Sequence, residues 1–311
     1  MTRGGLTYPA LCVLGILLFL ALQYSNAFYS GIIASILIWT VAVSGLNVVA
    51  GLGGYPSLMQ GGFYGIGAYA STLALNDGLA LPLAILAAIA VAAIAGLLVG
   101  LAFARTRGQY FAIGTLFFGV VVNLVLTNGA SLTGGPLGLS VPLAFASAAD
   151  LNIAIAASAA AAMMLVHAIG RSRIGRHLTA LREDEDYAEH LGVPTGRMKL
   201  LGFTISAGFG GFAGFLIAQY NGAISPDLFN YTVGFVMFVA LSLGGAARLA
   251  GPLLGSALIV GVPDLLNLPS GAGMLLVGIV FVVVIIMAPD GLIGAAQSLA
   301  ARLRARPAPA R

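Results

Sequence analysis

PLAILAAIAVAAIAGLLVGLAFA, residues 82–104, is a run without one charged or polar side chain. A helix of about 20 apolar residues crosses the hydrocarbon core of a bilayer, and a helix satisfies its own backbone hydrogen bonds there. Arg105 and Arg107 follow the run closely and mark the end at which water begins. The run therefore predicts one membrane-spanning helix.

The rest of the chain has the same character. Its 311 residues are 59% hydrophobic and only 8% charged, with a mean hydropathy of +1.02, whereas soluble domains carry about 25% charged residues. A surface so poor in charge cannot face water, so the predicted fold class is an all-α polytopic membrane protein. Long apolar runs predict about ten transmembrane helices, near residues 8–24, 31–50, 57–75, 82–104, 110–128, 151–169, 200–221, 232–247, 249–267 and 272–289.

The charges predict how these helices are oriented. With the N-terminus in the cytoplasm and alternating spans, every Lys and Arg falls on the cytoplasmic side, including those of the basic tail, residues 300–311. This agrees with the positive-inside rule, so both termini are expected in the cytoplasm. The net charge of +4 follows from the same rule and does not indicate nucleic-acid binding. The opposite side receives Asp77, Asp150, Asp227 and Asp264, and the exception is Asp290.

The first apolar run, residues 8–24, also resembles a secretory signal peptide, because Arg3 precedes it and residues 25–27 could form a cleavage site. We expect an uncleaved first span, since many spans follow it and insertion requires no cleavage. The single cysteine, Cys12, lies in this run, which excludes a disulfide or a thiolate metal cluster within the chain.

Two glycine-rich segments, residues 51–57 and 244–252, interrupt the apolar pattern. Non-helical backbone at membrane depth persists only where it is buried in protein or lines a watery cavity, and paired breaks are typical of transport pathways. Spans two to five match spans seven to ten with an offset of five, which predicts an inverted repeat. Each polar side chain near the breaks could line a substrate path or bond a neighbouring helix. The pathway candidates are Asn47, Ser57, Gln60, Asn123, Gly244 and Gly245.

No motif for catalysis or energy coupling is visible. GxxxxGK[ST] is absent, and the single lysine, Lys199, stands in another context, so we expect no ATP hydrolysis by that route. His167, His177 and His190 lack the spacing of metal ligands. Ion-coupled carriers usually hold ionisable groups deep in their spans, whereas Asp264 lies near a span end. We therefore expect a transport subunit powered from outside, with an ion-driven carrier and an intramembrane hydrolase using His167 as rival hypotheses.

Residues 171–199 form a loop that holds nearly half of the charged side chains. A helical segment is predicted to begin near Gly175 and to end at Gly192 and Pro194, which are stop signals. Connections usually run about 4–6 residues, so this length favours docking of a soluble partner over a solvated connector. Clustered acids repel unless neighbouring bases such as Lys199 pair with them. The expected apolar positions are Leu178, Leu181, Ala188 and Leu191; the water-facing ones are Arg182, Glu183, Asp184, Glu185, Asp186 and Glu189.

Residues 179–185, TALREDE, and 188–193, AEHLGV, carry a family resemblance. They resemble the cytoplasmic loop of the permease subunits of branched-chain amino-acid ABC importers, and the LivM-type subunit more closely than its LivH-type partner. The chain departs from the family pattern at Met59-Gln60, Leu137 and Asp186-Tyr187. Further similar stretches, covering nearly the full length, are residues 45–47, 63–69, 107–113, 132–139, 225–226, 244–255 and 289–292.

The resemblance implies a single transmembrane permease domain, residues 1–311, with an inverted-repeat architecture in the bacterial inner membrane. It also implies a second, LivH-type permease, two cytoplasmic ATPases that hold ATP and Mg, and a periplasmic solute-binding protein. No cofactor is expected on this chain. Substrates would be branched-chain, hydrophobic amino acids, although relatives carry urea, short amides or aromatic acids. Residues 175–193 would dock on an ATPase, with contacts from Arg182, Glu183, Asp184, Glu185, Ala188, Glu189 and Gly192.

Overall fold

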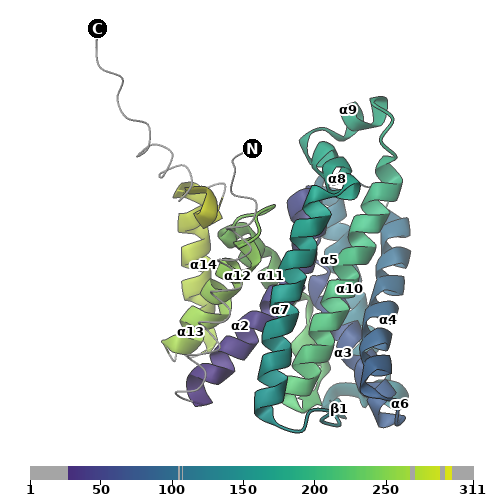
Figure 1. The fold of residues 1–311 in the computed structure, drawn as a ribbon, viewed down its shortest axis with the longest axis vertical. Helices are drawn as coiled ribbons and strands as arrows, with labels where there is room; N and C mark the ends of the chain where they lie inside the picture. Colours follow the sequence, from purple (N-terminus) through teal and green to yellow (C-terminus); the bar gives the residue numbers. More distant parts are fainter. Residues whose placement is uncertain (1–26, 104–105, 107, 267–269, 288–290, 296–311) are drawn as a thin grey trace.

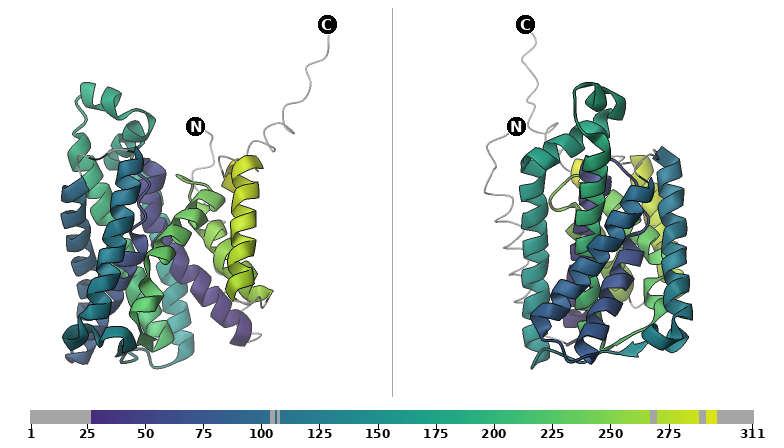
Figure 2. Two further views of the ribbon diagram at one scale, coloured as in Figure 1. Left: turned by 180° about the vertical axis from the view of Figure 1, so that it is seen from behind. Right: turned by 90° about the vertical axis from the view of Figure 1, so that its right-hand side faces the viewer.

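The computed structural model describes residues 27–103, 106, 108–266, 270–287 and 291–295. The predicted first span and the basic tail lie outside this range. Long helices run roughly side by side between two ends of the molecule, and two short helices project from one end (Figure 1). The opposite end carries short helices and a small two-stranded sheet (Figure 2).

The α-helices are α2 (Ala27–Leu46), α3 (Gln60–Asn76), α4 (Leu81–Phe103), α5 (Gly108–Asn128), α6 (Ala130–Thr133), α7 (Ala148–Arg171), α8 (Arg173–Glu183), α9 (Glu185–His190), α10 (Thr195–Asn221), α11 (Tyr231–Gly244), α12 (Gly251–Ser256), α13 (Val262–Leu265) and α14 (Ser270–Met287). Two π-helical segments, η1 (Asn47–Leu52) and η4 (Ala257–Gly261), continue α2 and α12. Two 3-10 turns are η2 (Gly135–Leu137) and η3 (Pro226–Phe229). The strands β1 (Leu139–Ser140) and β2 (Ala223–Ile224) pair antiparallel, with Leu139 opposite Ile224.

Within the described residues, six helical segments are long and apolar enough to cross a membrane. The all-α membrane class is thus supported, while the count of ten spans and the inverted repeat stay predictions. Two predicted spans are shorter than expected, because the glycine-rich breaks shorten them: α3 has 17 residues, and residues 251–265 form a shorter apolar helix. The six segments are Phe28–Leu52, Leu81–Phe103, Gly108–Asn128, Ala148–Arg171, Thr195–Asn221 and Pro226–Gly244.

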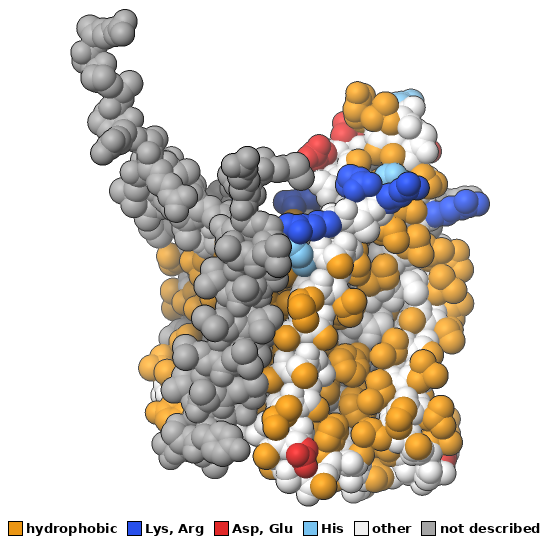
Figure 3. All heavy atoms as spheres, in the orientation of Figure 1, with side chains coloured by type: hydrophobic (Ala, Val, Ile, Leu, Met, Phe, Trp, Pro, Cys, Tyr) orange, Lys and Arg blue, Asp and Glu red, His pale blue; other side chains and the backbone are white. Residues whose placement is uncertain are grey.

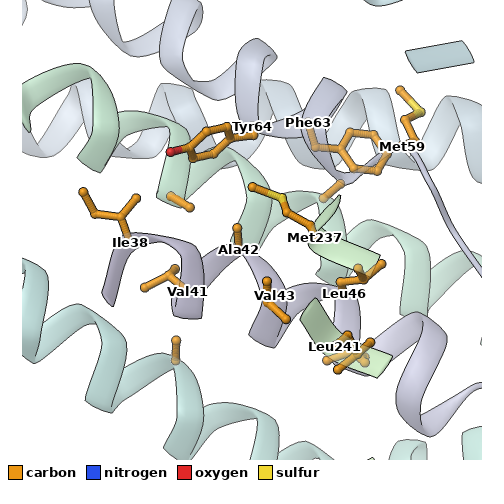
Figure 4. Close-up of a cluster of buried hydrophobic side chains, with 14 of the residues drawn as sticks. Ile38, Val41, Ala42, Val43, Leu46, Met59, Phe63, Tyr64, Met237 and Leu241 are labelled. Atoms are coloured by element: carbon orange, nitrogen blue, oxygen red, sulfur yellow. The ribbon is translucent and has the colours of Figure 1, made fainter. Parts of the chain in front are cut away.

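Helix α10 lies at the centre and packs most extensively against α4, α3 and α2. Small residues allow the close approach: a Cβ on Gly67 would overlap the backbone of Gly211, and one on Gly214 would lie 2.7 Å from the amide nitrogen of Ala68. Such contacts are the usual means by which helices associate in lipid. A hydrophobic cluster from α2, α3 and α11, including Phe63 and Met237, fills the space beside this crossing (Figure 4).

The outside of the bundle is apolar along its length. On α4 and α5 large side chains point outward, among them Leu98, 61% exposed, and Phe117, 64% exposed. Lys and Arg side chains gather near the end that carries α8 and α9 (Figure 3). Apolar flanks with charge confined to the ends are the distribution expected of a protein solvated by lipid.

Candidate coupling element and glycine-rich breaks

The charged loop folds into the two helices that project from one end, α8 and α9 (Figure 1). Ser172 caps α8, because its hydroxyl accepts a hydrogen bond from the amide of Gly175 at 3.3 Å. Asp184 has extended backbone, and its carboxylate caps α9 by accepting from the amide of Tyr187 at 2.9 Å. Asp and Ser are favoured at such positions. The predicted helical segment from Gly175 is therefore two helices that meet at Asp184.

The side chains of α8 and α9 separate into a buried and an exposed set. Leu178 and Leu181 are buried, as expected, and so is the docking candidate Ala188. Leu191, one of the expected apolar positions, is 67% exposed, and Tyr187 is 64% exposed. The sequence pattern did not identify these two side chains as an exposed apolar surface. The departure from the family pattern at Asp186-Tyr187 was the signal that could have indicated it. The exposed docking candidates are Arg182, Glu183, Asp184, Glu189 and Gly192.

Glu185 does not share the exposed position that was expected of it. Its carboxylate lies 2.6 Å from Nζ of Lys199, at the start of α10, and accepts a hydrogen bond from the hydroxyl of Tyr55 at 3.0 Å. Lys199 is only 5% exposed; its ammonium lies 4.8 Å from the centroid of the Tyr55 ring and donates to the carbonyl of Thr106 at 3.4 Å. The expected pairing of the acids with Lys199 is thus seen at Glu185.

The first glycine-rich break lies directly beneath α8. Arg182 donates from Nη1 to the carbonyl of Gly51 at 2.9 Å. Gly54 has a φ of +75°, and a Cβ there would lie 2.8 Å from Cγ of Arg182. Glycine is required at this point both by the backbone angle and by the close approach. In the sequence the charged loop and the first break are separate features, and the fold brings them into contact.

Asn47 connects the two breaks. Its Oδ1 accepts from the amide of Ala247 at 2.8 Å, and its Nδ2 donates to the carbonyl of Arg248 at 3.1 Å. Its side chain is 1% exposed. The oxygen and the nitrogen of this carboxamide therefore both bind backbone about 200 positions away, which aligns η1 with the segment that follows α11.

The other pathway candidates lie between packed helices or in the breaks themselves. Gln60 is fully buried and bonds α2 and α10, and Asn123 donates to the carbonyl of Pro226 at 2.8 Å. Ser57 is 1% exposed, and its Oγ has no hydrogen-bond partner among the described residues. Gly244 ends α11 against Gly251, where a Cβ would overlap the carbonyl oxygen. Gly245 follows with a φ of +114°.

A cavity of about 200 Å³ lies where the two breaks meet the end of α7. Asn47 lines it, together with Ala247 and Arg248 from the second break and His167 and Arg171 from α7. The other five pathway candidates are not among its lining residues. The fold therefore brings Asn47 and both breaks to one cavity, lined by polar and apolar groups, at the α8–α9 end, and places Ser57, Gln60 and Asn123 outside its lining.

Comparison with known proteins identifies the family. The sequence profile described as branched-chain amino acid transport system / permease component matches residues 28–288. The chain belongs to this family. Permease LivM of the high-affinity branched-chain amino acid transport system of Escherichia coli K12 is 34% identical over 292 residues, covering 83% of this chain and 68% of that protein. The family resemblance expected from the sequence is thus confirmed.

Two further relatives cover less of the permease. LivH of the same Escherichia coli system is 31% identical over 166 residues, or 49% of this chain and 53% of that protein. The autoinducer 2 import system permease LsrC of Enterobacter sp. strain 638 is 30% identical over 201 residues, or 61% of this chain and 56% of that protein. The same permease sequence pattern is therefore found in proteins named for different cargoes.

Asn47→Leu is expected to lower the free energy of unfolding of the permease by about 1–3 kcal/mol. The change keeps the number of side-chain heavy atoms but leaves the amide of Ala247 and the carbonyl of Arg248 without their buried partner, and unsatisfied backbone groups cost about that much. The apparent unfolding temperature in detergent measures the loss.

Asn128→Leu is the matched control, because Asn128 is exposed and bonds only the carbonyl of Leu124 in its own helix. A shift within about 0.5 kcal/mol is expected for this change. Equal losses for the two variants would contradict a bridging role for Asn47.

Proposed function

We propose that this permease is the LivM-type membrane subunit of an ATP-driven importer that carries branched-chain amino acids across the bacterial inner membrane. The observation that carries the proposal is the 34% identity to LivM over 83% of the chain. The match of residues 28–288 to the permease family supports it. The six apolar helical segments supply the membrane part that such a subunit needs.

The proposed assembly has four further subunits. A LivH-type permease would complete the membrane half, and the partial identity of this chain to LivH supports a pair of related permeases. Two cytoplasmic ATPases would bind ATP and Mg, and a periplasmic binding protein would deliver the amino acid. This chain would carry no cofactor and do no covalent chemistry.

We place the α8–α9 end in the cytoplasm, with both termini on that side and ten spans in two inverted units. The gathering of Lys and Arg near that end supports this orientation through the positive-inside rule (Figure 3). In this orientation α8 and α9 project beyond the membrane, where an ATPase could reach them.

The surface offered to the ATPase combines apolar and acidic groups. Tyr187, in α9, and Leu191, which caps the C-terminal end of α9, stand four positions apart and are both largely exposed. Residues four apart lie on one face of a helix. Exposed apolar side chains that lie together are typical of protein-binding surfaces, and Glu183 and Glu189 are exposed acids of the same two helices. This surface supports docking of α8–α9 in a groove of the ATPase.

Uptake of labelled leucine tests the proposed substrate class. The permease is expressed with its neighbouring importer subunits in cells that lack their own leucine importers, and uptake is measured with leucine, urea, a short amide and autoinducer 2 in parallel. Saturable uptake of leucine is expected. Uptake of another solute without leucine would show that the cargo differs, as the similarity to LsrC allows.

The energy source is tested with the permease alone. Purified chain in liposomes, without ATPase subunits, is expected to show no uptake under a proton or sodium gradient. Gradient-driven uptake would instead favour an ion-coupled carrier.

Replacing Glu183 and Glu189 together by lysine is expected to reduce the ATPase that co-purifies with the permease by about tenfold or more. The double change reverses the charge of two exposed acids on α8–α9, and like-charge contacts across an interface cost several kcal/mol. Co-purification in detergent and leucine uptake in cells measure the effect.

Asp77→Lys is the control, since Asp77 is an exposed acid at the opposite end of the molecule, after α3. It should leave both measurements unchanged. An intact ATPase complex with normal uptake in the Glu183/Glu189 variant would refute docking at this surface.

A further inference from the structure

The buried charges of this permease are concentrated where α9, α10 and the first break meet. Glu185 begins α9, Lys199 lies in the first turns of α10, and Tyr55 lies in the break between η1 and α3. The carboxylate touches both partners, at 2.6 Å to Lys199 and 3.0 Å to Tyr55. A charge pair with side chains only 6% and 14% exposed is screened little by solvent, so the three elements move as one unit at this point.

A second contact joins α8 to the same break. Arg182 binds the carbonyl of Gly51, and its Cα lies 3.0 Å from where a Cβ of Gly54 would stand. The break is thus held at both ends of residues 51–55, by Arg182 from α8 and by Glu185 from α9. A displacement of the two projecting helices acts on this short segment from both sides.

The first break is the part of this chain of contacts whose backbone changes conformation most easily. It begins within the π-helical segment η1 and contains Gly51, Gly53 and Gly54, and glycine backbone adopts new conformations more readily than other residues. Single π-helical turns are frequent at functional sites. Long helices resist bending, whereas this segment can change its dihedral angles.

The contacts continue to the second break. Asn47 lies at the start of η1 and binds the backbone of Ala247 and Arg248, and Ala247 has a φ of +61°. A Cβ on Gly51 would lie 2.6 Å from the amide nitrogen of Ala247. The first break therefore cannot shift without displacing the second, and the cavity of about 200 Å³ is lined from both.

We propose that Glu185, Lys199, Tyr55 and Arg182 form a coupling relay, which carries movement of α8–α9 to the first break, and that Asn47 passes it to the second. This inference rests on the proposed docking of an ATPase on α8–α9 and deepens it. These side chains are positioning residues: they touch neither ATP nor solute. Their role is to turn closure of the ATPases into a change of the membrane segments, a two-state element biased from one end.

The test separates docking from transmission in the full importer. Lys199→Met and Glu185→Gln are expected to leave ATPase co-purification intact, while leucine transported per ATP hydrolysed falls about tenfold, within the usual range of coupling between sites. The exchanged pair, Glu185→Lys with Lys199→Glu, should restore the ratio to within about threefold of wild type, because an attractive pair is regained. Asp77→Asn removes a charge at the opposite end and should not change the ratio.

Tyr55→Phe provides a milder variant, because removing one partner of a buried charge pair can prevent folding. The change keeps the ring under Lys199 and removes the hydroxyl bond to Glu185. A ratio lowered at least about twofold is expected. An unchanged ratio in Tyr55→Phe, or in a folded Glu185→Gln complex, would overturn the relay. A wild-type permease that does not co-purify with the ATPase at all would instead overturn docking itself.

Discussion

Gly67→Ala is expected to destabilise the permease by about 2 kcal/mol or more, although alanine is the better helix former. In an open helical site the exchange gains up to about 1 kcal/mol. Here the added Cβ would overlap the backbone of Gly211 at the crossing of α3 and α10. Backbone atoms cannot rotate away, so the two helices separate, and overpacking of this kind costs about 1–3 kcal/mol or more.

The measurement is the apparent unfolding temperature in detergent, supported by the yield of membrane-inserted protein. Gly119→Ala is the matched control, because Gly119 also lies within a helix, α5, and a Cβ there would meet nothing within 4 Å. The control should stabilise the protein slightly, so the two variants are expected to shift stability in opposite directions. A shift of the same sign in both would contradict the close crossing.

Gln60→Leu is the second change with a large expected effect. The carboxamide is fully buried and donates from Nε2 to the carbonyls of Ala42 at 2.8 Å and Ser206 at 3.2 Å. Its Oε1 accepts from the hydroxyl of Ser206 at 3.0 Å. Leucine removes all three bonds and leaves the Ser206 hydroxyl without its acceptor, which should cost about 1–3 kcal/mol.

A double-mutant cycle with Ser206→Ala separates this bond from general packing. Removing both polar groups should cost less than the sum of the single changes, with a coupling of about 0.5–3 kcal/mol. Gln109→Leu, at an exposed position, is the control for the exchange itself.

The same variants address the pathway hypothesis for Gln60. A residue that only joins α2, α3 and α10 should lower stability and the amount of transporter, while the solute concentration at half-maximal uptake stays unchanged. A selective change in that concentration for one amino acid would favour a pathway role instead.

Hydropathy predicted the long spans closely. The run at 82–104 is α4, Leu81–Phe103, and the run at 151–169 lies within α7, Ala148–Arg171. Lipid contact makes this possible, because a lipid-facing helix is apolar on every side and needs no tertiary partner to be recognised. Helix α10 begins at Thr195, five residues before the predicted span, because its polar first turn lies among the side chains of the charged loop.

The boundaries at the breaks were predicted less well. The span expected at 57–75 begins only at Gln60, and the one expected at 249–267 is divided into α12, η4 and α13. Glycine and proline indicated that the helices are interrupted there. They could not indicate how the interruptions are held, since Asn47 supplies hydrogen bonds from a residue about 200 positions away.

The sequence indicated where the candidate site lies, but not how its side chains are arranged. The cluster of charges at 171–199 identified the loop, yet its members have different roles: Glu183 and Glu189 are exposed, while Glu185 is held by Lys199 and Tyr55. Neighbouring acids look alike in a sequence. Whether a carboxylate faces water or a buried ammonium depends on where α10 and the first break lie beneath the helix.

The sequence by itself determined that this chain is a helical membrane permease with one charged, water-facing loop, because lipid and water each select side chains locally, residue by residue. The tertiary structure alone decided which parts touch. It placed Arg182 and Glu185 on the first break and Asn47 on the second. Those contacts join residues far apart in the chain through single hydrogen bonds and close glycine crossings, and no local pattern of hydrophobicity or charge records them.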